Sequence, residues 1–249
     1  MGLSLKIAIL IPSYKRPQVL KETLYNVLQN SMPESHLGTE VGLYVALNES
    51  SPEDMSVITS MVEPALQCNV KYAWVSYSEN RGKAVALNDL FNKFAGGYDY
   101  IVTMDNDMVV KLPWLHLIDV ATRTDFELMG FGSSTFWAHQ PRRELLGDKF
   151  YTLMDMYHIY RLDQIAGGMM LFPRQTLEKH KWTNKGGVYG FDDAQMCLDV
   201  NKKFVMFWDQ DWLDHDPLGT SASDLKQYHD RKQHFFNNGQ YILQKGWDS

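Results

Sequence analysis

Residues 100–107 read Tyr-Ile-Val-Thr-Met-Asp-Asn-Asp, five residues typical of a buried strand followed at once by two acids and an amide. Three earlier segments, residues 6–11, 41–47 and 70–75, predict strands of the same kind, and helices are predicted between them. Strands that alternate with helices form a mainly parallel sheet with helices on both faces. In such a sheet the ligand lies outside the carboxyl ends of the strands, which is where the acidic end of residues 100–107 falls.

Helix signals follow the predicted strands. Pro17 stands at a first helical position, where its missing N–H costs nothing, and an apolar stripe of helical period continues from it to Leu28. Residues 51–54, Ser-Pro-Glu-Asp, combine a cap, a first-turn proline and two acids near the positive end of a helix. A third helix is predicted over residues 82–94.

The composition is that of an ordinary globular domain and excludes several classes of protein. The 249 residues carry 24 Lys and Arg against 30 Asp and Glu, a net charge of −6, which argues against broad non-specific binding to nucleic acid. The apolar run from Ile7 to Ile11 is too short for a transmembrane segment or a signal-peptide core. Two cysteines, Cys68 and Cys197, cannot build a disulfide scaffold and are predicted to be buried thiols, so a cytoplasmic location is expected.

The second half of the chain has a less regular pattern. Residues 132–163 are aromatic and polar, and we expect them to be partly helical and to form a binding loop or lid rather than a mere connector. A strand is predicted over residues 165–172, a helix over residues 192–201 and a strand over residues 203–208. A loop over residues 209–217 follows.

Two acids and one histidine suggest a metal site. Asp105 and Asp107 are two residues apart just beyond a predicted buried strand, so both carboxylates can be held close to one small region. Such hard oxygen ligands suit Mg²⁺ or Mn²⁺, which would bridge the diphosphate of a bound nucleotide. His215, in a loop rich in Asp, can supply an imidazole as a third ligand. The alternatives are a surface turn at the acid pair and a solvated surface histidine.

A pair of acids, Asp192 and Asp193, opens the helix predicted after residue 191. The helix dipole favours the ionised form of a carboxylate at that position, and an ionised Asp within reach of a hydroxyl can act as a general base. The alternative is ordinary capping of the helix. Both roles fit a pair, and we predict that Asp193 is the base, with Asp192 as the alternative.

Further residues at predicted strand ends and helix starts are suited to a nucleotide. Residues 80–83, Asn-Arg-Gly-Lys, open a helix, where backbone N–H groups and basic side chains make an anion site. Tyr14 can stack on a base, Arg16 can pair with a phosphate or a carboxylate, and Glu49 can accept a hydrogen bond from a base imide or a ribose hydroxyl. Two glycines, residues 167–168, lie inside a predicted strand, which suggests close approach by a ligand or a β-bulge.

Taken together, these segments resemble the GT-A fold nucleotide-sugar glycosyltransferases, and most closely their family-2-like inverting branch. The resemblance runs from about residue 6 to residue 216, and the segments that carry it are residues 9–16, 80–83 with Ala86 and Asn88, 105–107, 167–168, 190–193 and His215. It implies a single α/β domain with a Rossmann-like, mostly parallel central sheet, helices on both faces and insertions on the acceptor side.

The resemblance also implies how the chain is divided. The glycosyltransferase domain would span residues 1–220, with a nucleotide-binding half at residues 1–107 and an acceptor-binding half at residues 108–220. Residues 221–249 would form a helical tail packed on that domain.

The same resemblance implies a role for each candidate residue. Those expected at the nucleotide are Pro12, Tyr14, Arg16, Glu49, Asn80, Lys83, Asp105, Asn106 and Gly168. Asp105, Asp107 and His215 would hold the metal, and Asp193 would deprotonate the acceptor hydroxyl. Glu49 stands where the family usually has an Asp that reads uracil, so the base is open, although UDP is favoured.

The implied activity is metal-dependent transfer of a sugar from a nucleotide sugar, a UDP-sugar by preference, to a hydroxyl of a glycan or another small acceptor, with inversion. Acceptor contacts are expected within residues 136–160, where Arg142 and Arg143 hint at an anionic acceptor. Three alternatives remain at this point. They are transfer to hydroxymethylated bases of phage DNA, which the net charge does not support; a metal-dependent nucleotidyltransferase, which would usually carry a Gly-rich loop where this chain has residues 13–16; and a degenerate sugar-binding or scaffold domain.

Overall fold

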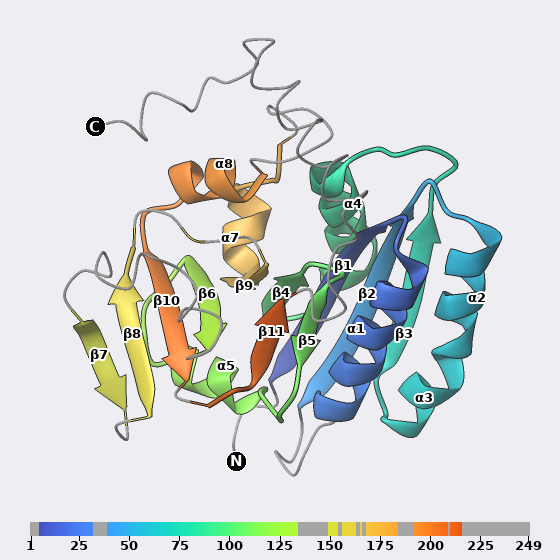
Figure 1. The fold of residues 1–249 in the computed structure, drawn as a ribbon. Coiled ribbons are helices and arrows are strands. Elements are labelled where there is room, and N and C mark those ends of the chain that lie inside the picture. The colour runs from blue at the N-terminus through green and yellow to red at the C-terminus, as the bar shows by residue number, and fades with distance from the viewer. Residues whose placement is uncertain are drawn as a thin grey trace.

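A computed structural model of the chain describes residues 5–31, 39–133, 149–153, 156–162, 165, 168–183, 192–208 and 210–215. Within these residues nine strands form one sheet in the order β3-β2-β1-β4-β9-β6-β10-β8-β7, and β11 pairs with β5 in a two-stranded ribbon (Figure 1). The strands are β1 (Lys6–Tyr14), β2 (Glu40–Asn48), β3 (Lys71–Ser76), β4 (Tyr100–Met104), β5 (Met108–Val110), β6 (Leu128–Ser133), β7 (Lys149–Leu153), β8 (Tyr157–Arg161), β9 (Met169–Pro173), β10 (Lys203–Trp208) and β11 (Leu213–His215). The helices are α1 (Pro17–Asn30), α2 (Pro52–Ser60), α3 (Val62–Gln67), α4 (Lys83–Leu90), the π-helix η1 (Phe91–Ala95), α5 (His116–Ala121), α7 (Arg174–Lys179) and α8 (Asp192–Asp199).

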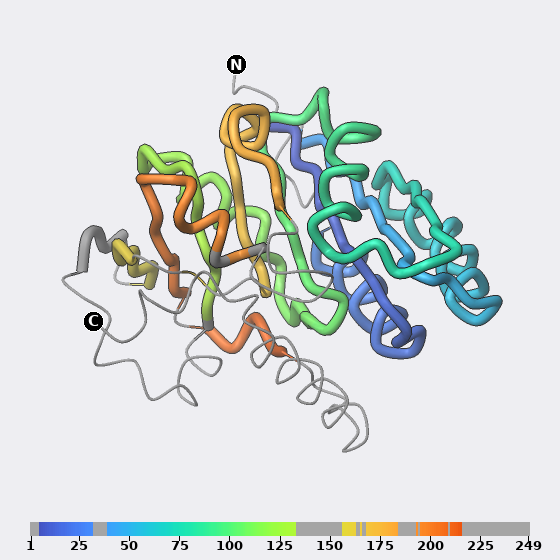
Figure 2. Tube along the Cα trace, turned by 90° about the horizontal axis from the view of Figure 1, so that it is seen from above, coloured from blue at the N-terminus to red at the C-terminus, as the bar shows by residue number. Residues whose placement is uncertain are grey.

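The first half of the sheet is parallel, as its alternating strands and helices predict. β1 pairs in parallel with β2 and β4, and β2 pairs in parallel with β3. In the second half β10 runs parallel to β6, whereas β9, β8 and β7 introduce antiparallel pairs. Seen from above, the blue-to-teal elements of the first half lie on one side of the molecule, and the yellow and orange strands of the second half lie on the other (Figure 2). The expected fold class, a large α/β sheet flanked by helices, is confirmed.

Helices cover both faces of the sheet with two separate apolar cores. The larger core packs α1, α2, α3 and α5 on one face, and Leu24 and Leu117 are fully buried in it. The smaller core packs α4, α7 and α8 on the other face around side chains such as Leu87 and Met196. Strands buried on both faces explain the continuous apolar runs in the sequence of β1 and β2.

The first strand continues beyond Pro12, where the sequence predicts its end. Pro12 is buried and stays in register with Ala46 of β2. The pairing of β1 with β4, by contrast, extends only from Ile7 to Leu10. At Pro12 the strand therefore has a ladder partner on one side only, and a residue without an N–H is tolerated there. With this extension to Tyr14, β1 reaches the carboxyl end of the sheet, where the acids of residues 105–107 follow β4.

The second half differs from the sequence expectation in three places. The described parts of residues 132–163 contain strands that the sequence pattern does not predict; in β8 the side chains of Tyr157 and Ile159 are buried and alternate with more exposed neighbours. Polar and aromatic residues at the alternate positions hide this two-residue period in the sequence. The expectation that this segment is partly helical stays a prediction, because residues 134–148 lie outside the described part. The strand expected from residue 165 begins at Met169, and the loop expected around residues 209–217 contains β11. Residues 216–249, with the predicted helical tail, lie outside the described part.

Both cysteines are free and buried, as predicted. Burial raises the pKa of the Cys197 thiol to about 11, so this thiol is protonated at neutral pH. None of the helices in the described part of the chain is long and apolar enough to cross a membrane.

The start of α2 provides a test of the local sequence signals. The Ser51 hydroxyl accepts a hydrogen bond from the Asp54 backbone N–H at 3.1 Å, and the Asp54 carboxylate accepts one from the Ser51 backbone N–H at 2.8 Å, which completes a capping box. We expect Ser51→Ala to lower the free energy of unfolding by about 1 kcal/mol, measured by urea denaturation. Ser56→Ala, at an exposed position inside the same helix, is the matched control and should leave stability unchanged or slightly higher. Equal losses in the two variants would contradict this assignment.

Candidate active site

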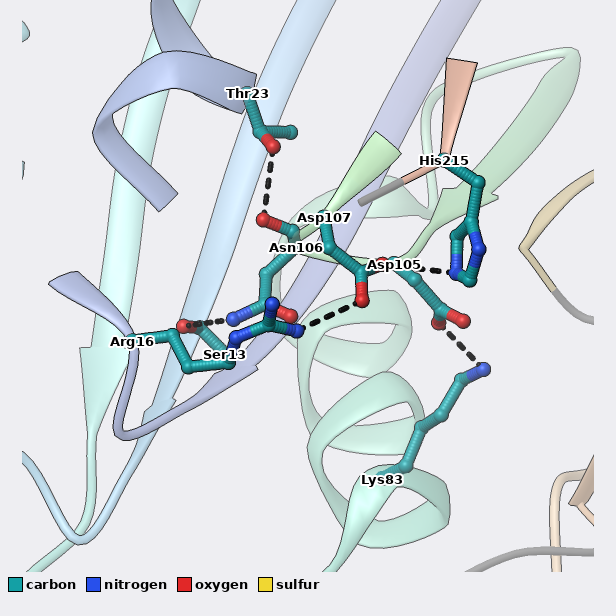
Figure 3. Close-up of polar contacts among 8 residues, drawn as sticks. All are labelled: Ser13, Arg16, Thr23, Lys83, Asp105, Asn106, Asp107 and His215. Atoms are coloured by element: carbon teal, nitrogen blue, oxygen red, sulfur yellow. Dashed lines mark hydrogen bonds and ion pairs between the residues drawn. The ribbon is translucent and has the colours of Figure 1, made fainter. Parts of the chain in front are cut away.

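The acidic segment after β4 is held at three points by other parts of the fold. The backbone N–H of Asp105 donates to the carbonyl oxygen of Gly168 at 2.8 Å, just before β9. Asn106 is bound on both sides: its carbonyl accepts from the Thr23 hydroxyl of α1 at 2.8 Å, and its side-chain amide donates to the Ser13 hydroxyl of β1 at 2.9 Å (Figure 3). Asn106 therefore fastens the acidic segment to both α1 and β1.

His215 reaches the same place through backbone pairing. β11 runs antiparallel to β5, so that His215 lies opposite Met108, the residue that follows Asp107. Trp212, which is fully buried, precedes this strand; its carbonyl accepts from the Lys111 N–H at 2.7 Å and its indole donates to the Gly132 carbonyl at 3.1 Å. The ribbon therefore delivers an imidazole from the C-terminal part of the chain to the acidic segment.

Three cationic or potentially cationic side chains surround the two carboxylates (Figure 3). Arg16 Nη1 lies 2.8 Å from Asp107 Oδ2, and Lys83 Nζ lies 2.6 Å from Asp105 Oδ1. His215 Nε2 lies 3.5 Å from Asp107 Oδ1. Burial by itself would raise the pKa of the Asp107 carboxyl, but His215 and Arg16 outweigh that effect and hold the pKa below its ordinary value. Asp107 is therefore ionised at neutral pH.

The donor set fits a hard divalent cation. The Oδ1 atom of Asp107 is enclosed by protein and accepts no hydrogen bond from the residues that the structure describes. It faces the His215 Nε2 atom across 3.5 Å, and these two side chains would hold such a cation. Among the described residues, however, no three His, Cys, Asp or Glu side chains lie together in a way that could hold a metal ion. The carboxylates of Asp105 and Asp107 face basic side chains instead.

The segment before α4 shows which polar residues shape the helix start. Gly82 adopts φ 85°, a left-handed conformation that favours glycine, and its N–H donates to the Asn80 side chain at 3.0 Å. The buried Asn48 side chain accepts from the Arg81 N–H at 3.1 Å. Asn88 donates to the Trp182 carbonyl at 2.7 Å and so fastens α4 to the chain after α7. These amides order the loop that presents Lys83 to Asp105.

Tyr14 and Glu49 lie at the ends of neighbouring strands. Lys15 and Glu49 both have positive φ, 45° and 51°, and their side chains form an ion pair at 2.8 Å. The Lys15 ammonium also lies 5.1 Å from the centre of the Tyr14 ring. Tyr14 and Glu49, which are expected to contact the base, thus form a partly exposed rim at the carboxyl ends of β1 and β2.

The remaining candidates are placed as follows. Pro12 is buried inside β1, two residues before Tyr14. Gly168 precedes β9, and a Cβ there would lie 3.0 Å from the Met108 sulfur, so the Met108 side chain approaches this glycine closely. Asp193 is partly buried at the second residue of α8. The side chain of Asp192 and residues 142–143, 167 and 190–191 lie outside the described part.

Sequence reasoning missed two residues that hold the site together. Thr23 and Trp212 act through tertiary hydrogen bonds, and neither was expected at the site. One signal was present: Thr23 is a hydroxyl residue within the apolar stripe of α1, and it is fully buried. A polar group at such a position requires a partner, which here is the carbonyl of Asn106.

The sequence matches a known enzyme family over most of its length. The family model described as "Glycosyltransferase like family 2" matches residues 5–203. The chain therefore belongs to this family, as the resemblance in its sequence predicts. A search of curated proteins gave no match.

Solved structures of glycosyltransferases share this fold at low sequence identity. The mannosyltransferase PcManGT from Pyrobaculum calidifontis, solved with GDP-Man and Mn²⁺, has a TM-score of 0.62 at 16% identity, covering 92% of this chain and 61% of PcManGT. TarS from S. aureus has a TM-score of 0.60 at 12% identity, covering 93% of this chain and 65% of the TarS chain. GalNAc-T7, solved with UDP, GalNAc and Mn²⁺, has a TM-score of 0.60 at 14% identity, covering 92% of this chain and 48% of GalNAc-T7. This chain thus spans less than two thirds of each of these structures, and the similarity establishes the GT-A fold.

The Thr23–Asn106 hydrogen bond can be tested by removing one hydroxyl. Thr23→Val keeps the shape of the side chain but leaves the Asn106 carbonyl without this donor, and we expect a loss of about 1–2 kcal/mol in the free energy of unfolding. Thr23→Ser keeps the hydroxyl and should lose less. Thermal or urea unfolding of both variants gives the measurement. A Val variant as stable as the wild type would show that the bond does not hold the acidic segment.

Proposed function

We propose that the chain transfers a sugar from a nucleotide-sugar donor to an acceptor hydroxyl with the help of Mn²⁺ or Mg²⁺. The observation that carries this proposal is the contact between Asp107 and His215 at the carboxyl ends of the parallel strands, with Asp105 two residues earlier in the same segment, in a member of a glycosyltransferase family. The Mn²⁺ and nucleotides in the structures of PcManGT and GalNAc-T7 support it.

The donor diphosphate is proposed to lie over the acidic segment. Asp105, Asp107 and His215 hold the metal, which supplies positive charge that stabilises the departing nucleoside diphosphate. Arg16 and Lys83 lie within reach of the same phosphates, because their charged ends already contact the acidic residues at 2.8 and 2.6 Å. The metal ion, Arg16 and Lys83 together can neutralise the negative charge that develops on the leaving diphosphate.

The base and ribose are proposed to contact the rim formed by Tyr14 and Glu49, with Pro12, Asn80, Asn106 and Gly168 shaping the surrounding backbone. A ring stacked on Tyr14 would place its polar edge near the Glu49 carboxylate, which accepts hydrogen bonds. A uracil imide suits such an acceptor, so a UDP-sugar is the preferred donor. Guanine also presents N–H donors, and GDP is the alternative to test.

Asp193 is proposed as the general base. Its position at the second residue of α8 places the carboxylate at the positive end of the helix dipole. An ionised Asp193 takes the proton of the acceptor hydroxyl as the hydroxyl oxygen attacks the anomeric carbon, the bond to the diphosphate breaks, and the anomeric configuration is inverted. Asp192 is the alternative base.

The acceptor is proposed to be a glycan or another small hydroxyl compound bound by the second half of the chain. Residues 1–107 then form the nucleotide-binding half and residues 108–220 the acceptor-binding half of one domain. A hydroxymethylated DNA base is a weaker alternative, because the net charge of −6 does not favour a polyanion.

A nucleotidyltransferase is the second candidate, because a putative glucose-1-phosphate thymidylyltransferase from Bacillus anthracis has a TM-score of 0.54 at 12% identity, covering 90% of this chain and 94% of that protein. The two reactions release different products: a glycosyltransferase releases a nucleoside diphosphate, whereas a nucleotidyltransferase that joins a nucleoside triphosphate to a sugar phosphate releases pyrophosphate. In this chain β1 leads through Lys15 and Arg16 directly into α1 without a glycine, which favours the first reaction.

The proposal is tested by product release. With Mn²⁺ and a panel of UDP-, GDP-, CMP- and dTDP-sugars, we expect one donor to yield its nucleoside product, and EDTA to abolish the release. Asp107→Asn should lower the rate by about a hundredfold or more, because metal binding contributes several kcal/mol of charge stabilisation. Asp125→Asn removes the same charge at an exposed ion pair with Lys202, just before β6 at the opposite end of the sheet, and should retain full activity. Pyrophosphate release from a nucleoside triphosphate and a sugar phosphate would instead support the second candidate.

A further inference from the structure

Each of the two carboxylates that the proposed function assigns to a metal already has a basic partner. Lys83 Nζ contacts Asp105 at 2.6 Å, and Arg16 Nη1 contacts Asp107 at 2.8 Å. All four side chains are largely enclosed, with exposed fractions of 24% and 30% for Lys83 and Asp105 and of 22% and 16% for Arg16 and Asp107. Two positive and two negative charges thus balance within a small, partly desolvated space.

A divalent cation that enters this space alone meets an unfavourable charge balance. It adds two positive charges beside two ion pairs that are each already balanced, and it competes with Lys83 and Arg16 for the same two carboxylates. The displaced ammonium or guanidinium would then remain partly buried without its carboxylate, which is costly. A nucleoside diphosphate changes this charge balance. Its diphosphate would give Lys83 and Arg16 new anionic partners when a metal ion binds the two carboxylates.

We propose that Lys83 and Arg16 exchange partners, holding Asp105 and Asp107 in the empty enzyme and moving to the donor diphosphate when the metal binds. This inference rests on the proposed function and makes metal and donor bind cooperatively, while the metal alone binds weakly. By linkage, the factor by which the nucleotide tightens metal binding equals the factor by which the metal tightens nucleotide binding.

The two basic residues differ in how they make this exchange. An ammonium group is a compact point charge, so Lys83 must leave the Asp105 oxygen that a metal ligates. A guanidinium carries five N–H donors in a planar fork, so Arg16 can keep one contact with Asp107 while another N–H reaches a phosphate. Lys83 is therefore the residue whose removal changes metal binding most.

The test is direct measurement of Mn²⁺ binding to the full chain by equilibrium dialysis, with and without saturating UDP, or GDP if the donor screen selects it. Formation of the Mn²⁺–nucleotide complex is measured in protein-free chambers and subtracted. For the wild type we expect the nucleotide to lower the Kd for Mn²⁺ by about tenfold or more. Independent binding of the two ligands to the wild type would overturn the inference while leaving the proposed function intact.

The variant Lys83→Met provides a result that a merely structural role would not give. We expect Mn²⁺ alone to bind several-fold more tightly than to the wild type, UDP alone to bind more weakly, and the cooperativity between them to decrease. Lys71→Met is the matched control, because Lys71 forms an ion pair of 2.7 Å with Glu40 at the amino end of β3, and it should leave all three quantities unchanged. Unchanged or weaker Mn²⁺ binding in a folded Lys83→Met protein would overturn the exchange. If the wild type bound neither Mn²⁺ nor any nucleotide of the panel, the proposed function itself would fail.

Discussion

The backbone pairing of β11 with β5 is the interaction on which the candidate site depends. It fixes His215 opposite Met108, and Met108 directly follows the acidic segment, so the ladder register alone sets the imidazole beside Asp107. The register is secured by Trp212, whose indole is fully buried and hydrogen-bonded to the Gly132 carbonyl. A large aromatic residue in the core thereby positions a polar residue at the surface, since the two are separated by only two residues of extended chain.

Electrostatic balance is the second constraint on this region. The acidic segment lies where parallel strands end, and α1 and α4 begin close to it, so Arg16 and Lys83 meet the carboxylates directly. Partial burial makes each of these charges dependent on a partner, because an unpaired charge in such a place is strongly destabilising. The arrangement keeps the Asp107 carboxylate ionised and orients both carboxylates, which a site that recognises a cation and a phosphate needs.

The sequence predicts much of this fold because its central strands are buried on both faces. β4 and β10 occupy the residues expected from their apolar runs, and α2 begins at the capping signal at Ser51. The acidic segment and its approach to His215 also follow from the order of segments along the chain. For Arg16 the sequence leaves a phosphate and a carboxylate open as partners, and around Lys83 it indicates only an anion site, so the two ion pairs could not be singled out. The three-residue strand β11 is too short to show a period, and its position is decided by tertiary pairing alone.

The ribbon formed by β5 and β11 is separate from the nine-stranded sheet, and three residue pairs join its two strands. Elements with few pairs open more readily than central strands, and they do so without unfolding the remainder of a protein. Such a sub-global opening would carry the imidazole away while both carboxylates stayed on the end of β4. The local stability of the pairing between β5 and β11, and not the stability of the domain as a whole, would therefore set how much of the time His215 lies beside Asp107.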